Sequence, residues 1–205
     1  MAPPAESALP GSAPGAEEGD AEQRLVMYGV PWRDYCVLRE LLDSPGLRMT
    51  YIEGTLELMT PSPLHERLKT TIARLVETFA LERDVPLYGY GSTTFRSEAK
   101  ERGLEPDECY VMGGELRESP DIALEVVVKS GGIDKLAVYA GLGVGEVWFF
   151  EDGSFHLYAL AGQTYRAIDR SELVPELDFA ELAALAMRPD QHEAVREYSR
   201  RLRKS

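Results

Sequence analysis

The chain has 205 residues, of which 44% are hydrophobic and 28% are charged, and its formal net charge is −13. This length is enough for one domain with a sizeable core, and no apolar run approaches the roughly 18 residues that cross a membrane. The acidic balance argues against broad, non-specific attachment to DNA, which needs clustered lysine and arginine, but it leaves room for a local basic cleft.

The first segment, residues 1–22, is rich in Ala, Pro, Gly, Ser and Glu and contains no basic residue. Such a composition buries too little apolar surface to offset the entropy lost on ordering, so the segment is predicted to be a disordered acidic tail. It also lacks the basic start and apolar stretch of a signal peptide, which makes the cytoplasm the expected location. Residues 23–205 are predicted to form a single domain.

The first half of this domain combines helical and strand-like patterns. A helix is predicted from Pro31 through WRDYCVLRELLD, and a longer amphipathic helix is predicted over 61–84 with Ser62 as its cap. Between them, residues 47–59 read as two short strands about the turn Glu53-Gly54. Residues 85–97 predict one or two strands with a bend marked by glycine.

The second half contains more strands and ends in helices. The predicted strands are 107–112, 121–128, 147–151, 154–160 and 163–168, and the predicted helices are about 132–142, 178–186 and 191–205. The unit of strand, helix and strand over 121–151 should be parallel and right-handed. The predicted fold class is therefore α+β or α/β, with a mixed central sheet flanked by helices.

A charged residue interrupts the most apolar of these strands. Glu125 lies inside DIALEVVV, where an unpaired carboxylate would be costly to bury. If a hairpin places Met112 opposite Asp121, Asp107 lies opposite the segment from Glu125 to Val127. Asp121 itself is four residues from Glu125, about 13 Å along a strand. Asp107 is therefore the predicted partner of Glu125, and Asp121 is predicted to start the strand.

Two lysines follow Glu125. Lys129 shares its strand face but is again about 13 Å away, whereas Lys135 begins the next helix near the end of the sheet where the carboxylates should meet. Two carboxylates and a lysine suit phosphodiester hydrolysis, because the acids can hold Mg²⁺ or Mn²⁺ and the lysine can orient water or steady the phosphate. We therefore predict Asp107 and Glu125 as metal ligands and Asp107, Glu125 and Lys135 as catalytic residues.

Several motifs resemble one family. YIEGTLELMTPSPLHERL, GSTTFR, EPDECYV, PDIALEVVVKS and DKLAVYAGLGVGEVWFFEDG, within about residues 24–170, are similar to the Uma-two-like family of restriction-endonuclease-like proteins in the PD-(D/E)XK nuclease superfamily. The resemblance implies a restriction-endonuclease-like core and divalent-metal-dependent cleavage of DNA. Carried over, the motif aspartate is Asp107, the motif glutamate is Glu125, and the lysine of the following helix is Lys135.

The chain departs from the superfamily pattern at one position. The usual lysine two residues after the glutamate is replaced by Val127. A catalytically silent nuclease-fold protein that serves as a binding or scaffold module is therefore the alternative prediction. By analogy with other nucleases of this fold, a homodimer acting on DNA is expected. At the head of the long helix, His65 could contact the site or cap the helix, and the structural role is favoured. Glu66 beside it is considered as an outer carboxylate.

Overall fold

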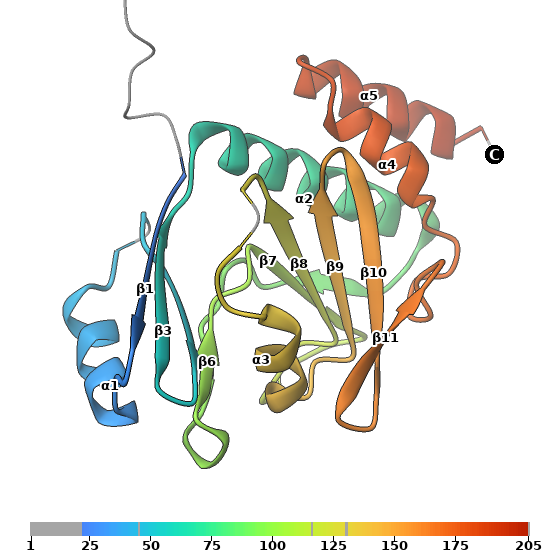
Figure 1. Ribbon diagram of the computed structural model, residues 1–205. Coiled ribbons are helices and arrows are strands. Elements are labelled where there is room, and N and C mark those ends of the chain that lie inside the picture. Colours follow the sequence, from blue (N-terminus) through green and yellow to red (C-terminus); the bar gives the residue numbers. More distant parts are fainter. Residues whose placement is uncertain (1–21, 45, 116, 130, 205) are drawn as a thin grey trace, which may run out of the picture.

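The computed structural model describes residues 22–204 except positions 45, 116 and 130. These residues form five α-helices, one short 3-10 helix and eleven strands in two sheets, which is the mixed α+β class predicted (Figure 1). The predicted tail lies outside the described residues apart from Glu22, which is buried. Among the helices described, none is long and apolar enough to span a bilayer.

A six-stranded mixed sheet forms the centre of the fold. Its spatial order is β11 (Thr164–Ile168), β10 (Ser154–Ala161), β9 (Glu146–Glu151), β8 (Ile122–Val127), β7 (Glu108–Met112) and β4 (Leu87–Gly89). β8 and β9 are parallel, and the other neighbours are antiparallel. The helix α3 (Lys135–Leu142) connects the parallel pair, as predicted.

A second, antiparallel sheet lies beside the first and was not predicted as a separate unit. Its order is β1 (Gln23–Tyr28), β3 (Thr55–Thr60), β2 (Arg48–Ile52), β6 (Arg102–Leu104) and β5 (Phe95–Ser97), and the 3-10 helix (Glu98–Lys100) joins the last two. The helix α1 (Trp32–Leu41) packs on this sheet, where the rings of Tyr35 and Tyr51 stack at 4.7 Å. This sheet brings the N-terminal part of the domain next to the central strands (Figure 1).

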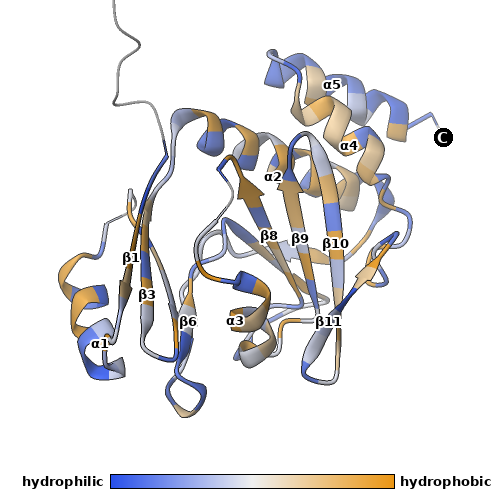
Figure 2. Cartoon of the chain, in the orientation of Figure 1, coloured by the Kyte–Doolittle hydropathy of each residue, from blue (hydrophilic) through white to orange (hydrophobic). Residues whose placement is uncertain are grey.

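The helices sort onto two faces of the central sheet. The helices α2 (Pro63–Arg83), α4 (Phe179–Ala186) and α5 (Gln191–Leu202) cover one face, and α3 lies on the other, between the two sheets (Figure 1). Figure 2 shows β8 and β9 as largely hydrophobic strands between these layers. Along β8, Leu124 and Val126 pack with α2, whereas Ala123 packs with α3. Because side chains alternate along a strand, Glu125 shares the α3 face with Ala123.

Two N-terminal helix caps define the positions of residues in the site. Ser62 caps α2, as predicted, by accepting a hydrogen bond from the backbone N–H of His65 at 3.2 Å. Asp134 caps α3 by accepting from the N–H groups of Leu136 and Ala137. His65 and Lys135 thus both lie in the first turn of a capped helix, where the backbone is well defined.

The loop before α3 is held by Glu57, and this contact is testable. Glu57 Oε2 accepts from the N–H of Ile133 at 2.9 Å, and a Cβ placed on Gly132 (φ +99°) would lie 1.8 Å from that oxygen. A Cβ on Gly131 (φ +110°) would meet nothing within 4 Å. In both alanine variants the strained backbone should lower the free energy of unfolding by about 1–3 kcal/mol. In Gly132→Ala, overpacking against Glu57 should lower it by about 1–3 kcal/mol more.

Urea unfolding of the two variants measures this difference. Gly131→Ala is the matched control, since it changes the same residue type in the same loop at a similar φ. Equal losses in the two variants would mean that the Glu57 contact does not constrain the loop.

Candidate active site

The hairpin of β7 and β8 brings Asp107 next to Glu125. Asp107 immediately precedes β7, and the register pairs Glu108 with Leu124, so the next position along places Asp107 across from Glu125. Asp107 Oδ2 accepts a hydrogen bond from the N–H of Val126 at 2.7 Å. The two predicted carboxylates therefore meet on adjacent strands, although the register differs by one residue from the pairing predicted for the turn.

The one-residue difference comes from Asp121. Its carboxylate accepts from the N–H of Met112 at 2.7 Å, and its own N–H bonds the carbonyl of Tyr110 at 3.0 Å. Tyr110 therefore pairs with Ile122. Asp121 closes the end of the hairpin, which is the strand-start position predicted for it.

Glu125 is fully buried and is held by two side chains of α3. Its Oε2 accepts from Lys135 Nζ at 2.6 Å, and its Oε1 accepts from the hydroxyl of Tyr139 at 2.5 Å. Lys135 and Tyr139 are four residues apart, so one face of the helix presents both donors. Burial raises the pKa of Glu125 to about 7, and the neighbouring ammonium of Lys135 offsets only part of that rise.

Asp107 is held differently, by a histidine from α2. His65 is fully buried, and its Nε2 lies 2.9 Å from Asp107 Oδ1. Burial disfavours the charge on Asp107, yet the contacts with His65 and the Val126 N–H bring the pKa of Asp107 below its ordinary value. Burial likewise opposes the charge on His65, but Asp107 raises the pKa of His65. The pKa of Glu125 is thus raised and the pKa of Asp107 is lowered, a pattern typical of functional pairs of carboxylates.

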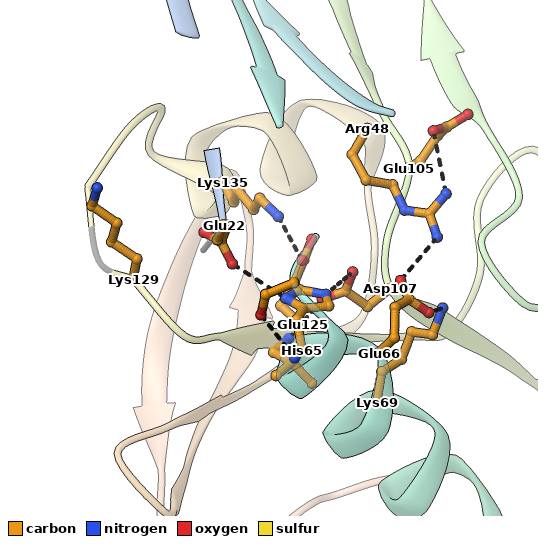
Figure 3. Close-up of polar contacts among 12 residues, drawn as sticks. Glu22, Arg48, His65, Glu66, Lys69, Glu105, Asp107, Glu125, Lys129 and Lys135 are labelled. Atoms are coloured by element: carbon orange, nitrogen blue, oxygen red, sulfur yellow. Dashed lines mark hydrogen bonds and ion pairs between the residues drawn. The ribbon is translucent and has the colours of Figure 1, made fainter. Parts of the chain in front are cut away.

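The two candidate lysines differ in position. Lys135 reaches Glu125 with a side chain that is 17% exposed. Burial opposes its charge, but the carboxylates of Glu125 and Asp107 raise the pKa of Lys135. Lys129 is exposed, and its ammonium lies away from the carboxylates (Figure 3). Glu66, considered as an outer carboxylate, instead pairs with Lys69 at 2.5 Å.

A cavity of about 550 Å³ opens beside Lys135. Its lining includes Arg24, Glu57, Val127 and Gly132 as well as Lys135. Asp107 and Glu125 are 2% and 0% exposed, so Lys135 is the member of the trio that reaches the cavity wall. A ligand in this cavity would therefore meet the ammonium of Lys135 before either carboxylate.

The donor chemistry fits a divalent metal only if other ligands complete the site. Across the described residues, no group of three or more His, Cys, Asp and Glu side chains is placed to hold a metal ion. Asp107 and Glu125 supply hard oxygen donors, and a carboxylate oxygen that accepts one hydrogen bond retains further lone-pair capacity. Mg²⁺ is commonly bound by one or two carboxylates together with water and substrate phosphate. The two carboxylates could supply the protein ligands of such a site, but they are buried behind Lys135, which would have to leave room for water and phosphate.

Sequence reasoning missed the contribution of Tyr139 and did not favour that of His65. Both side chains are fully buried against the carboxylates, and Figure 3 shows His65 among them. The spacing of Tyr139 from Lys135 was a usable signal, because a helix that presents Lys135 to Glu125 presents the residue four positions later as well. For His65, contact with the site was one of two alternatives, and the structural role at the head of the helix was favoured over it.

The phenol of Tyr139 gives a test of how strongly Glu125 depends on its donors. Tyr139→Phe removes one hydrogen bond from a buried carboxylate and should lower the free energy of unfolding by about 1–3 kcal/mol. Tyr110→Phe is the control, because the buried Tyr110 hydroxyl has no hydrogen-bond partner in the described part of the chain. That control should be neutral or stabilising in urea unfolding. Equal losses in both variants would contradict a role for Tyr139 as a donor to Glu125.

Comparison with known proteins shows which family and which solved structure the chain resembles. The family model Uma2, described as "Putative restriction endonuclease", matches residues 32–188. A crystal structure described as a "putative nuclease belonging to DUF820 from Anabaena variabilis" is similar at 14% identity and a TM-score of 0.49, covering 71% of this chain and 98% of that chain. A search of curated proteins gave no match. The family model confirms the family predicted from the sequence.

Proposed function

This chain belongs to the Uma2 family, described as "Putative restriction endonuclease", and on that premise we propose that it is a divalent-metal-dependent endonuclease that hydrolyses DNA phosphodiester bonds. One observation carries the proposal. Two buried carboxylates from adjacent strands, Asp107 and Glu125, meet an ammonium at the edge of a cavity. A purely structural carboxylate has no need of a second buried acid beside it, since like charges disfavour each other.

Each residue of the trio has a role in this proposal. Asp107 and Glu125 would hold Mg²⁺ or Mn²⁺ through their carboxylate oxygens. The bound metal would supply charge neutralisation on the phosphate and a lowered pKa for its water. Lys135, at the cavity wall, orients the attacking water and donates to the charge that develops on the phosphate. His65 and Tyr139 keep the two carboxylates in place through their hydrogen bonds.

A metal soak with a cleavage assay tests the proposal. Crystals soaked in Mn²⁺ should show anomalous density between the carboxylates of Asp107 and Glu125. The purified protein should nick plasmid DNA with Mg²⁺ or Mn²⁺ and stop when EDTA is added. Carboxylates too far apart to bridge one ion, or cleavage that persists in EDTA, would contradict the mechanism.

A binding or scaffold module without catalysis is the second candidate. The observation that favours it is the direct bond between Lys135 and Glu125, which occupies an ammonium needed for chemistry and a carboxylate needed for metal. Val127 at the usual lysine position points the same way. Retention of DNA on the protein without Mn²⁺ binding and without cleavage would favour this candidate over the nuclease.

Homodimerisation is part of the proposal by analogy with nucleases of this fold. Two copies would place two sites on the two strands of a duplex. Light scattering during size-exclusion chromatography should give twice the mass of the 22.8 kDa chain. A mass of one chain would remove the dimer from the proposal but leave the chemistry of Asp107 and Glu125 untouched.

A further inference from the structure

A third buried acid approaches the site from the start of the domain. Glu22 precedes β1 and lies outside the residues matched by the family model, yet it is only 6% exposed. Arg24 Nη2 donates to Glu22 Oε1 at 2.9 Å and to the carbonyl of Lys129 at 3.2 Å. Glu22 is therefore fixed in orientation, and β1 is tied to the loop that leads from β8 to α3.

The second oxygen of Glu22 faces the histidine of the site. Glu22 Oε2 lies 3.4 Å from His65 Nδ1, and both atoms are buried. Within the described residues, neither atom has a hydrogen-bond partner. Buried polar atoms are almost always paired, so two such atoms facing each other at this distance are best explained as partners of one another. Figure 3 shows Glu22, His65 and Asp107 in this order.

The other ring nitrogen of His65 completes the chain of contacts. Nε2 lies 2.9 Å from Asp107 Oδ1, so the ring has a carboxylate at each nitrogen. A ring held at both nitrogens cannot rotate or shift without breaking a contact. The orientation of the Asp107 carboxylate therefore depends on Glu22 through His65.

We propose that Glu22 is a positioning residue of the active site, which fixes the His65 ring and through it the metal-binding orientation of Asp107. The inference rests on the proposed role of Asp107 as a metal ligand. It makes the position just before β1, outside the family match, a functional part of the nuclease site. Residues that orient metal ligands commonly affect metal affinity by about 10–100-fold, and Glu22 acts one residue further away.

Metal affinity of the full chain measures this role without a cleavage assay. Glu22→Ala should weaken Mn²⁺ binding about tenfold, the lower end of that range, when free Mn²⁺ is followed by electron paramagnetic resonance. Glu22→Gln keeps an oxygen that can accept a hydrogen bond from His65 Nδ1, so its Mn²⁺ affinity should fall less than that of Glu22→Ala. Glu53→Ala is the matched control, because that side chain is 68% exposed and pairs with Arg102 away from the site. Its affinity should equal that of the wild type.

A second measurement reports the contact itself. The ring N–H protons of His65 should give downfield NMR signals in the wild type, and Glu22→Ala should shift the signal of the N–H that faces Asp107. If Glu22→Ala does not fold, the folded Glu22→Gln variant should still bind Mn²⁺ more weakly than the wild type. Unchanged affinity and unchanged His65 signals in a folded variant would overturn the inference.

The experiments can contradict the proposed nuclease function without contradicting the positioning role of Glu22. A wild type that binds Mn²⁺ but does not cut DNA would remove the nuclease proposal, while an affinity loss in Glu22→Ala would still support the positioning role. A wild type that bound no Mn²⁺ would overturn the inference as well, because Asp107 would then not be a metal ligand.

Discussion

Replacement of Glu125 by glutamine is expected to lower the rate of Mg²⁺-dependent plasmid nicking by at least about 10³-fold. Bound metal contributes several kcal/mol to such reactions, and about 4 kcal/mol corresponds to this factor. The amide keeps the size of the side chain and an oxygen for the Tyr139 hydroxyl, but it removes the charge that faces Lys135 and the proposed metal. The variant therefore tests the charge of Glu125 and not the packing around it.

Asp121→Asn is the matched control for this variant. It makes the same carboxylate-to-amide change in the same hairpin, and the amide oxygen can still accept from the N–H of Met112. Its nicking rate should stay within about twofold of the wild type, as for substitutions away from functional features. Thermal unfolding checks that both variants are folded. Equal nicking by Glu125→Gln and the wild type would indicate a contaminating nuclease or a different site.

The pKa of Glu125 adds a second readout for the same variant. Because burial raises this pKa to about 7, the metal-free wild type should exchange a proton for Mn²⁺ near neutral pH. Mn²⁺ affinity of the wild type should therefore rise as the pH increases through about 7. Glu125→Gln has no proton to release at this position and should lack that rise.

Much of the fold could be predicted from local patterns. The long amphipathic helix, its Ser62 cap and the parallel pair of β8 and β9 all follow from periodicity, turn residues and chain order. Two strands, β1 and β6, were not predicted from the sequence. β1 has no buried residue, since its side chains alternate only between exposed and half-buried at first, and β6 has only three residues, so neither has the buried face that marks a strand. The division into two sheets depends on pairings between distant segments, such as β2 with β6, which local patterns do not specify.

Some residues of the site could be predicted from the sequence, and others could not. Asp107 and Glu125 could be brought together because they lie in one hairpin, where a turn sets the register to within a residue. Lys135 followed from the parallel connection after β8. His65 reaches Asp107 from α2 over a separation of 42 residues, and Glu22 reaches His65 from the segment before β1 over a separation of 43 residues. Only tertiary packing creates such contacts, and no spacing rule encodes them.

The placement of the lysine leads to the second large effect. Lys135→Met should lower kcat by about 10²–10³-fold, the usual loss when one preorganised donor to a developing charge is removed. Methionine keeps most of the aliphatic length, so the change isolates the ammonium. Lys129→Met is the control, because that side chain is exposed and lies away from the carboxylates. A loss in Lys129→Met in place of Lys135→Met would contradict the assignment and move the role to Lys129, in the segment after β8.

Because Lys135 also pairs with buried Glu125, a structural effect must be separated from a catalytic one. A structural effect would lower the melting temperature and leave kcat of the folded fraction unchanged. Val127 offers a sharper comparison, since it stands two residues after Glu125, on the same face of β8, and lines the cavity beside Lys135. Partial recovery of kcat in Lys135→Met with Val127→Lys would show that an ammonium is required in this cavity, whether α3 or β8 supplies it.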